Sequence, residues 1–325
     1  MLVSYAANRL NLFYYIRSNM NKTLMPMYRF LILCISFSAL FTACTEKETI
    51  NHTEHTNVII DDNTAPPYDE VTTVQIQNYI NKMYIDLIGR EPLQQELEDD
   101  TNLLKNNNIS LAVRIQLLDQ LMSDTLYFDR FFDIYSTAYL NGTQEPEIIF
   151  QINQYKSQKE QAEQAGNYAY AQYLQLEIDK LDNLLASTDE YENNEIAVNE
   201  FMLRVSYNYF YDQINMGSEN FVKACFENFL KRFPTDSELS ASVAMVDGVS
   251  SQLLLRDGST KKEFIEIITT YPGFYEGLAI DIYQQLLARN PDSEEMNDAT
   301  IFLSENPDYQ AIQQKVIVSS EYAGF

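Results

Sequence analysis

The chain has 325 residues, with 22 Lys and Arg against 47 Asp and Glu, and a formal net charge of −25. Nucleic acid repels so acidic a body, which argues against a nucleic-acid partner. The chain holds two histidines, His52 and His55, and three cysteines, Cys34, Cys44 and Cys225. These numbers exclude a disulfide framework and a cysteine-rich metal cluster.

The N-terminal region has the pattern of an export signal. Basic residues precede the apolar run Phe30 to Thr42, and no acidic residue occurs before Glu46. The run is shorter than the roughly 20 apolar residues that span a bilayer, so it predicts a cleaved signal peptide over residues 1–43. Because the segment before the run is long for a signal, we expect translation to start at Met20, Met25 or Met27.

The apolar run ends in "LFTAC", with Ala43 directly before Cys44. This resembles the lipobox of bacterial lipoproteins, which implies that Cys44 is lipidated and anchors the protein in the outer membrane. The acidic "EKE" that follows resembles the export signal of surface lipoproteins in Bacteroidota, which implies an outward orientation. The alternatives are an ordinary secretory signal with an unrelated cysteine, and a periplasmic orientation.

Residues 44–72 are predicted to form a disordered tether. They are polar, contain Pro66-Pro67 and show no apolar periodicity, so they bury too little surface to offset the entropy of ordering. Both histidines lie in this segment, where a disordered pair rarely makes a closed metal site. The four basic residues before Cys44 leave 18 Lys and Arg against 47 Asp and Glu after it, a formal charge of −29.

The remaining chain predicts an all-α fold. Apolar residues recur every three or four positions, as in the stripe Ile76, Tyr79, Ile80, Met83, Tyr84 and Leu87. The segment "KVIVSS" is also expected to be helical from its repeat context, although its local propensity favours a strand. The triplets "VDG" at Val246 and "RDG" at Arg256 predict turns.

One junction occurs three times along the chain. When Arg90, Arg232 and Arg289 are aligned, an aromatic residue lies six positions before each arginine. A proline lies two positions after it and a glutamate six positions after it: Pro92 and Glu96, Pro234 and Glu238, Pro291 and Glu295. The recurrence predicts three related units, each a helix, an Arg-x-Pro turn and two further helices, over residues 73–142, 201–277 and 278–325.

Residues 143–200 predict an inserted antiparallel helical hairpin. The helical pattern is broken by "QAGNY" around Gly166, and the second arm carries an apolar stripe. That stripe comprises Tyr170, Tyr173, Leu174, Ile178, Leu181, Leu184 and Leu185. The first arm is more polar, so we expect it to project into solvent or to meet a partner.

The repeated phrases carry a family resemblance. "LIGREP…LMSDTLYF" and "LLARNP…IVSSEY" resemble the helical repeat of bacterial extracellular proteins with the pattern "LLGRxPD…SPEY", a phycobilisome-linker-like domain. The first copy, with "YIDLIGREP" and "RIQLLDQLMSDTLYFDRFF", also resembles a cytochrome-associated domain of unknown function common in Planctomycetes. Both resemblances imply small helical modules without established catalytic residues.

The Arg-x-Pro junction has a structural explanation. An arginine in the last turn of a helix interacts favourably with the helix dipole, and proline is tolerated at the first helical position. "PTDSE" and "PDSEE" supply capping-box residues, and each arginine is placed to pair with the glutamate six residues later. The alternative is that the three arginines grip an anionic ligand.

No catalytic residue, metal site or cofactor is expected. The chain has no histidine after His55, so the helical body lacks the residue that Ser-His-Asp and Cys-His catalysis and histidine-ligated zinc require. It also lacks a P-loop and a calcium-loop spacing. An enzyme would need carboxylates clustered in a concave pocket.

The stretch "YNYFYDQI", Tyr207 to Ile214, is the best ligand candidate, through Tyr207, Tyr209 and Tyr211. Tyrosine rings stack on sugars and offer hydroxyl groups for hydrogen bonds. At helical spacing, however, Tyr207, Phe210, Tyr211 and Ile214 share one face, which is more simply explained as core. We therefore expect a surface lipoprotein that acts as a non-catalytic structural or protein-interaction module, with glycan binding as the alternative.

Overall fold

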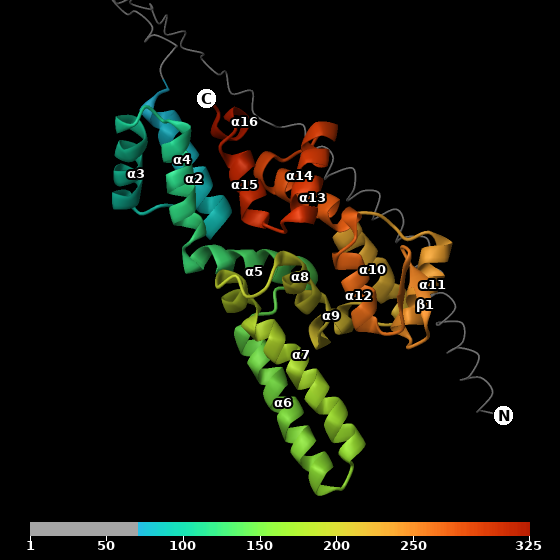
Figure 1. Cartoon of the computed structure of the whole chain (residues 1–325). Helices are drawn as coiled ribbons and strands as arrows, with labels where there is room; N and C mark the ends of the chain where they lie inside the picture. The colour runs from blue at the N-terminus through green and yellow to red at the C-terminus, as the bar shows by residue number, and fades with distance from the viewer. Residues whose placement is uncertain (1–70) are drawn as a thin grey trace, which may run out of the picture. The chain divides into compact units, whose positions relative to one another are not determined.

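The computed structural model describes residues 71–325, which form fifteen helices and one small sheet (Figure 1). The all-α prediction is confirmed. The signal segment, Cys44, both histidines and the tether up to residue 70 lie outside the described residues.

Helices α2 to α7 make up the first part of the described chain. Their bounds are α2 Thr73–Ile88, α3 Gln94–Asn106, α4 Leu111–Met122, α5 Thr125–Tyr139, α6 Glu145–Gln164 and α7 Tyr168–Glu192. The middle of the chain contains α8 Val198–Ser206, α9 Tyr209–Ile214, α10 Ser218–Leu230, α11 Asp236–Val246, β1 Ser251–Leu253, β2 Arg256–Gly258 and α12 Lys261–Thr269. The last helices are α13 Pro272–Leu287, α14 Ser293–Glu305, α15 Tyr309–Ile317 and α16 Ser320–Ala323.

Each Arg-x-Pro junction joins two of these helices: α2 to α3, α10 to α11, and α13 to α14. The third expected helices correspond to α4, α12 and α15, so "KVIVSS" is helical up to Ile317. Helices α13 to α15 lie between α2 to α4 on one side and α10 to α12 on the other (Figure 1). The expected boundaries at 200/201 and 277/278 fall inside α8 and α13, because the helices run on without a break there.

Buried tyrosines connect parts of the chain that are far apart in sequence. Tyr127 Oη donates a hydrogen bond to Gln313 Oε1 at 2.6 Å, and Tyr139 Oη donates to the carbonyl of Asn228 at 3.1 Å. Both rings belong to one hydrophobic core, which also includes Leu181 and Leu184 from the root of α7. A tyrosine fills the volume of a core aromatic while its hydroxyl satisfies a buried acceptor, which explains the use of many tyrosines.

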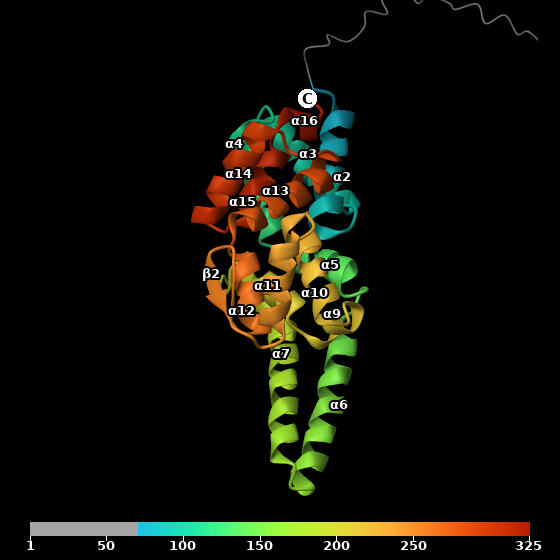
Figure 2. The same ribbon diagram turned by 90° about the vertical axis from the view of Figure 1, so that its right-hand side faces the viewer.

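Helices α6 and α7 form the predicted antiparallel hairpin, which projects from the other helices (Figures 1 and 2). Within residues 71–325, the start of α2 and the hairpin tip lie at opposite ends in both views. The last residues lie beside the start of α2, where the Tyr79 ring meets the rings of Tyr322 and Phe325 edge to face. No helix in the described part of the chain combines the length and hydrophobicity needed to cross a bilayer.

The predicted apolar stripe of α7 is only partly buried. Leu174, Ile178, Leu181 and Leu184 are buried, whereas Tyr170 and Tyr173 are exposed and stack on each other with ring centroids 6.1 Å apart. The buried face of α7 near the tip is formed by Ala171, Leu174 and Ile178, which recur every three or four residues, and Tyr170 and Tyr173 lie outside it.

The expectation of a turn at "RDG" is wrong. Arg256–Gly258 forms strand β2, which pairs antiparallel with β1 through a two-residue loop, Leu254 and Leu255. Both loop residues have positive φ, 51° and 66°. The primed turns of short hairpins require this left-handed backbone, and Asn-Gly is its usual sequence signal. Because Leu-Leu carries no such signal, the sequence did not indicate the hairpin.

Candidate binding site

The three junctions share one side-chain arrangement. Each arginine forms two hydrogen bonds of 2.6–2.8 Å with the glutamate six residues later. Each guanidinium also lies 5.1–5.5 Å from the centroid of the aromatic ring six residues before it, which is Tyr84, Phe226 or Tyr283. Hydrogen bonding to the arginine lowers the pKa of all three glutamates, that of Glu238 to about 2.

The guanidinium groups of the three junction arginines are therefore already paired with carboxylates of the same chain. Arg289 has a further carboxylate partner, since its Nη2 lies 2.6 Å from Glu321 in α16. A ligand anion would have to displace these internal partners, so the junctions hold helices together rather than forming an open anion site.

The prolines occupy a different position from the expected one. The second helices begin at Gln94, Asp236 and Ser293, so each proline lies one residue before the N-cap rather than at the first helical position. Thr235 and Asp292 form capping boxes with Glu238 and Glu295, as "PTDSE" and "PDSEE" suggested. At the first junction the N-cap is Leu93, which has no polar side chain, and only its backbone N–H bonds to Glu96, at 2.7 Å.

The three candidate tyrosines do not form one platform. Tyr207 follows the end of α8, whereas Tyr209 and Tyr211 belong to the separate helix α9. Asn208 separates the two helices because its side chain accepts hydrogen bonds from the backbone N–H groups of Phe210 and Tyr211. The face that the spacing predicted for Tyr207 to Ile214 therefore does not exist.

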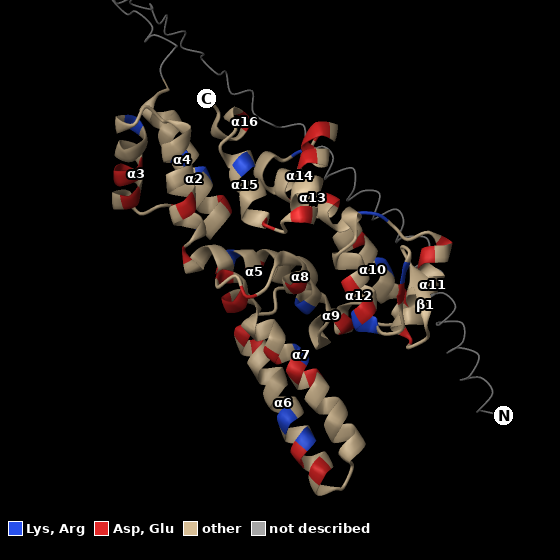
Figure 3. Cartoon of the chain, in the orientation of Figure 1, with Lys and Arg blue, Asp and Glu red and all other residues tan. Residues whose placement is uncertain are grey.

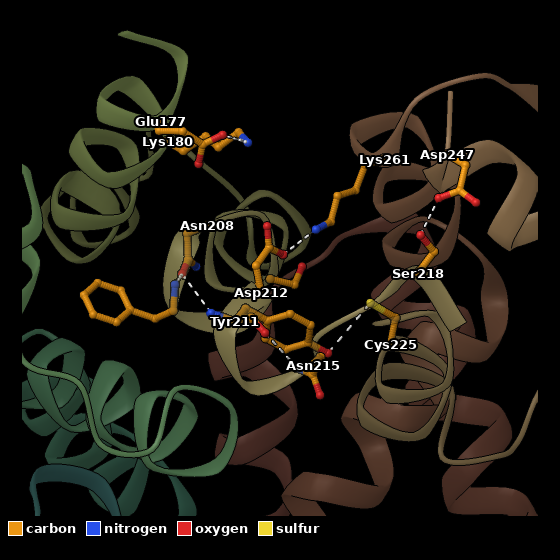
Figure 4. A network of polar contacts seen from close by, with 12 residues as sticks. Glu177, Lys180, Asn208, Tyr211, Asp212, Asn215, Ser218, Cys225, Asp247 and Lys261 are labelled. Carbon is orange, nitrogen blue, oxygen red and sulfur yellow. Dashed lines mark hydrogen bonds and ion pairs between the residues drawn. The ribbon is translucent and has the colours of Figure 1, made fainter. Parts of the chain in front are cut away.

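Tyr211 is fully buried and cannot contact a ligand in this structure. Its hydroxyl lies 3.7 Å from Cys225 Sγ (Figure 4). The same hydroxyl accepts a hydrogen bond of 2.9 Å from the side-chain amide of Asn228. Burial raises the pKa of the Cys225 thiol to about 12, so the thiol is an inert core group, as its position in a helical run indicated. Tyr209 is half-buried against Tyr155 of α6.

Two ion pairs flank α9 (Figure 4). Lys261 of α12 pairs with Asp212 of α9, and Lys180 of α7 lies 2.7 Å from Glu177 one turn earlier. Burial raises the pKa of Asp212, although Lys261 opposes the shift. Burial alone would lower the pKa of Lys180, but the ion pair with Glu177 raises it. Lys180 therefore remains charged beside a half-buried surface.

An open groove of about 420 Å³ lies between α7 and α8. We call it the α7–α8 groove; it is lined by Tyr173, Leu176, Glu177, Asp179, Lys180, Asn183, Glu200, Leu203, Arg204, Tyr207 and Lys262. Of the candidate tyrosines, only Tyr207 belongs to it. Tyr173, Leu176 and Lys180 were not predicted to form a surface, although their spacing of three and four residues places them on one face of α7.

A second hollow, of about 430 Å³, lies at the root of the hairpin. Its lining includes four carboxylates, Asp129, Asp133, Glu145 and Asp189. Burial, reinforced by the neighbouring carboxylates, raises the pKa of Asp129. No group of three or more His, Cys, Asp or Glu side chains within residues 71–325 is arranged to hold a metal ion.

Comparisons with known proteins give no family for the chain. No protein-family model matches it, and no curated protein or solved structure shows significant similarity to it.

Proposed function

We propose that this protein is a lipid-anchored, non-catalytic interaction protein at the outer-membrane surface, and that its helical hairpin docks a protein partner. The lipobox at Cys44 and the polar tether support the anchor. The junction arginines, paired with internal carboxylates, and a sequence without histidine after His55 support a role other than catalysis. The hollow at the root of the hairpin, with its four carboxylates, is the place where a carboxylate-based enzyme would act instead. We also propose that the helical units are related to the "LLGRxPD…SPEY" repeat that they resemble.

The observation that carries the docking proposal is the hairpin's exposed apolar surface. Phe150 of α6 and Tyr168 at the tip are 62% and 67% exposed. Phe150 lies in the second turn of α6, near the root of the hairpin, whereas Tyr168 begins α7 at the tip, which lies at the opposite end from the start of α2. A chain tethered through the segment before α2 would hold this surface away from the anchoring membrane, where a partner can reach it. Phe150 adjoins Ile149, which is 39% exposed, and exposed apolar side chains that adjoin one another are typical of contact sites.

The anchor is tested by replacing Cys44. In the native host, we expect metabolic labelling with a fatty acid and partition into detergent for the wild-type protein. The Cys44→Ala variant should lose the label and leave the membrane fraction, whereas Cys225→Ala should retain both properties. A Cys44→Ala variant that keeps its lipid and its membrane fraction would contradict the proposal.

The docking proposal is tested by shortening the hairpin. Deletion of residues 159–162 and 169–172 removes about one turn from each arm, retains the loop around Gly166 and leaves Tyr173 and Leu176 of α7 in place. Removal of the whole insertion would be uninformative, because Leu181 and Leu184 belong to the main core. We expect affinity capture from the native membrane to lose a specific protein with the shortened hairpin and with Phe150→Ser.

The matched control is Leu255→Ser, which changes an exposed leucine at the distant β-loop. It should leave the captured proteins unchanged. An identical set of captured proteins for the wild-type and shortened hairpins would rule out the hairpin as the docking element.

A further inference from the structure

The α7–α8 groove combines apolar and polar side chains in a small space. The rings of Tyr173 and Tyr207 and the side chains of Leu176 and Leu203 supply apolar surface, and Tyr173 and Leu176 are 52% and 61% exposed. The volume of about 420 Å³ lies within the range of roughly 300–1,000 Å³ that is usual for small-ligand sites.

The polar side chains of the groove are held in place by ion pairs. Lys180 Nζ lies 2.7 Å from Glu177 Oε1 and 4.4 Å from the centroid of the Tyr207 ring. Arg204 lies 2.7 Å from Glu190 and 3.0 Å from Glu200, and it donates a hydrogen bond to the Asn183 carbonyl. Because these long side chains are already ordered, a ligand would not have to supply the free energy of immobilising them.

The charges that line the groove balance. Three cations, Lys180, Arg204 and Lys262, face three carboxylates, Glu177, Asp179 and Glu200. This balance is unusual in a chain with 47 acidic and 22 basic residues (Figure 3). Each of these cations is already paired, Lys180 with Glu177, Arg204 with Glu190 and Glu200, and Lys262 with Glu266, so none is free for an anionic ligand. A neutral ligand with many hydrogen-bonding groups therefore suits the groove best.

We propose that the α7–α8 groove binds a short, neutral oligosaccharide. A pyranose ring presents C–H groups on its faces, which pack on tyrosine rings and leucine side chains, and hydroxyl groups around its edge. Carboxylate, amide and ammonium groups at the rim accept and donate hydrogen bonds with those hydroxyls. The site uses Tyr173 of α7 together with Tyr207, so it differs from the surface that Tyr207, Tyr209 and Tyr211 suggested.

The size of the groove argues against a helical peptide as its occupant. A stable protein interface buries about 800 Å² on each partner and has a continuous apolar centre. Here the lining includes two ion pairs, Glu177–Lys180 and Arg204–Glu200, as well as the apolar residues. The sugar site is thus independent of the protein docking proposed for Phe150 and Tyr168, and either can fail without the other.

Calorimetric titration of the full-length protein, purified in a detergent without a sugar headgroup, tests the proposal. The probes are neutral hexasaccharides of glucose, xylose, mannose and galactose, with oligogalacturonate as the charged comparison. We expect at least one neutral hexasaccharide to bind, with an affinity that is unchanged between about 50 mM and about 500 mM NaCl because no charge pairing is involved.

The residues are tested with matched variants. Tyr173→Ala should weaken binding roughly tenfold through the loss of one stacking contact. Tyr168→Ala, an exposed tyrosine at the hairpin tip, should leave the affinity unchanged. Because Tyr207 packs partly against the core, Tyr207→Phe keeps its packing and should change affinity only through the hydroxyl, with circular dichroism as the check on folding.

Three results would overturn the proposal. The first is no binding of any neutral hexasaccharide at millimolar concentration. The second is binding that Tyr173→Ala leaves intact. The third is binding of oligogalacturonate alone with strong salt dependence, which would assign the groove to an anion.

Discussion

Arg232 holds Glu238 across the Pro234 corner through two hydrogen bonds, 2.8 Å from Nη1 to Oε2 and 2.6 Å from Nη2 to Oε1. The same carboxylate accepts the backbone N–H of Thr235 at 2.8 Å and so also caps α11. One side chain therefore fixes both the angle between two helices and the first turn of the second helix. This double role explains why the spacing from arginine to glutamate is six at all three junctions.

Replacing Glu238 by glutamine should lower the free energy of unfolding by about 1 kcal/mol. The change removes the charge of the ion pair and weakens the capping box, and partial exposure to water limits the loss. Urea unfolding followed by circular dichroism measures it. Glu266→Gln is the control, because Glu266 forms an exposed pair with Lys262 at 3.4 Å and should change stability by less than about 0.5 kcal/mol. Equal losses in the free energy of unfolding for the two variants would show that the geometry of the junction adds nothing to stability.

The contribution of Glu238 should depend on pH in a defined direction. Hydrogen bonding to Arg232 lowers its pKa from the ordinary 4.5 to about 2. The stabilisation is therefore present above pH 4.5 and is lost as the pH falls towards 2. Half-buried Asp212 and Asp281 act in the opposite direction, because partial burial raises the pKa of each and their contribution to stability is lost as the pH rises.

The difference in stability between the wild type and Glu238→Gln isolates the contribution of Glu238 from that of the aspartates. It should shrink as the pH is lowered from 4.5 to 2, because the aspartates are common to both proteins. Urea titrations at several pH values measure the difference. A difference that stays constant over this range would contradict the depressed pKa.

Replacing Ala288 by glycine should stabilise the protein by roughly 0.5 kcal/mol. The residue before each junction arginine has a left-handed backbone: φ is 73° at Gly89, 51° at Lys231 and 54° at Ala288. Glycine adopts this conformation without steric cost, and its greater freedom in the unfolded chain offsets part of the gain. The converse change, Gly89→Ala, should cost about 1 kcal/mol. Thermal unfolding measures both, and a destabilised Ala288→Gly would show that the left-handed cap carries no strain.

The helices could be predicted from sequence, but the surfaces that they expose could not. The three-to-four spacing indicated α2 and the hairpin, and the aligned arginines indicated the three junctions.

The same spacing included Tyr170 and Tyr173 in the apolar stripe of α7, because periodicity identifies a face of a helix without showing what covers that face. The prediction that Tyr207 and Tyr211 share one helical face was wrong, because Asn208 is the N-cap of a new helix within this aromatic stretch. The α7–α8 groove depends on Lys262 meeting α7 and α8, a contact between distant segments that no local pattern encodes.

Replacing Leu255 by asparagine should stabilise the protein by roughly 0.5–1 kcal/mol. Leu255 lies at the tip of the β1–β2 hairpin with φ 66° and is 92% exposed, so its side chain contributes almost no packing. Asparagine tolerates left-handed backbone better than leucine, because its short polar side chain bonds locally. The rise in unfolding temperature measures the gain, and Leu253→Asn is the contrasting variant. Leu253 is buried on β1, so the same substitution two residues earlier should destabilise the protein by burying an amide in the core. If Leu255→Asn also destabilised the protein, the exposed leucine would have a packing role that its 92% exposure does not suggest.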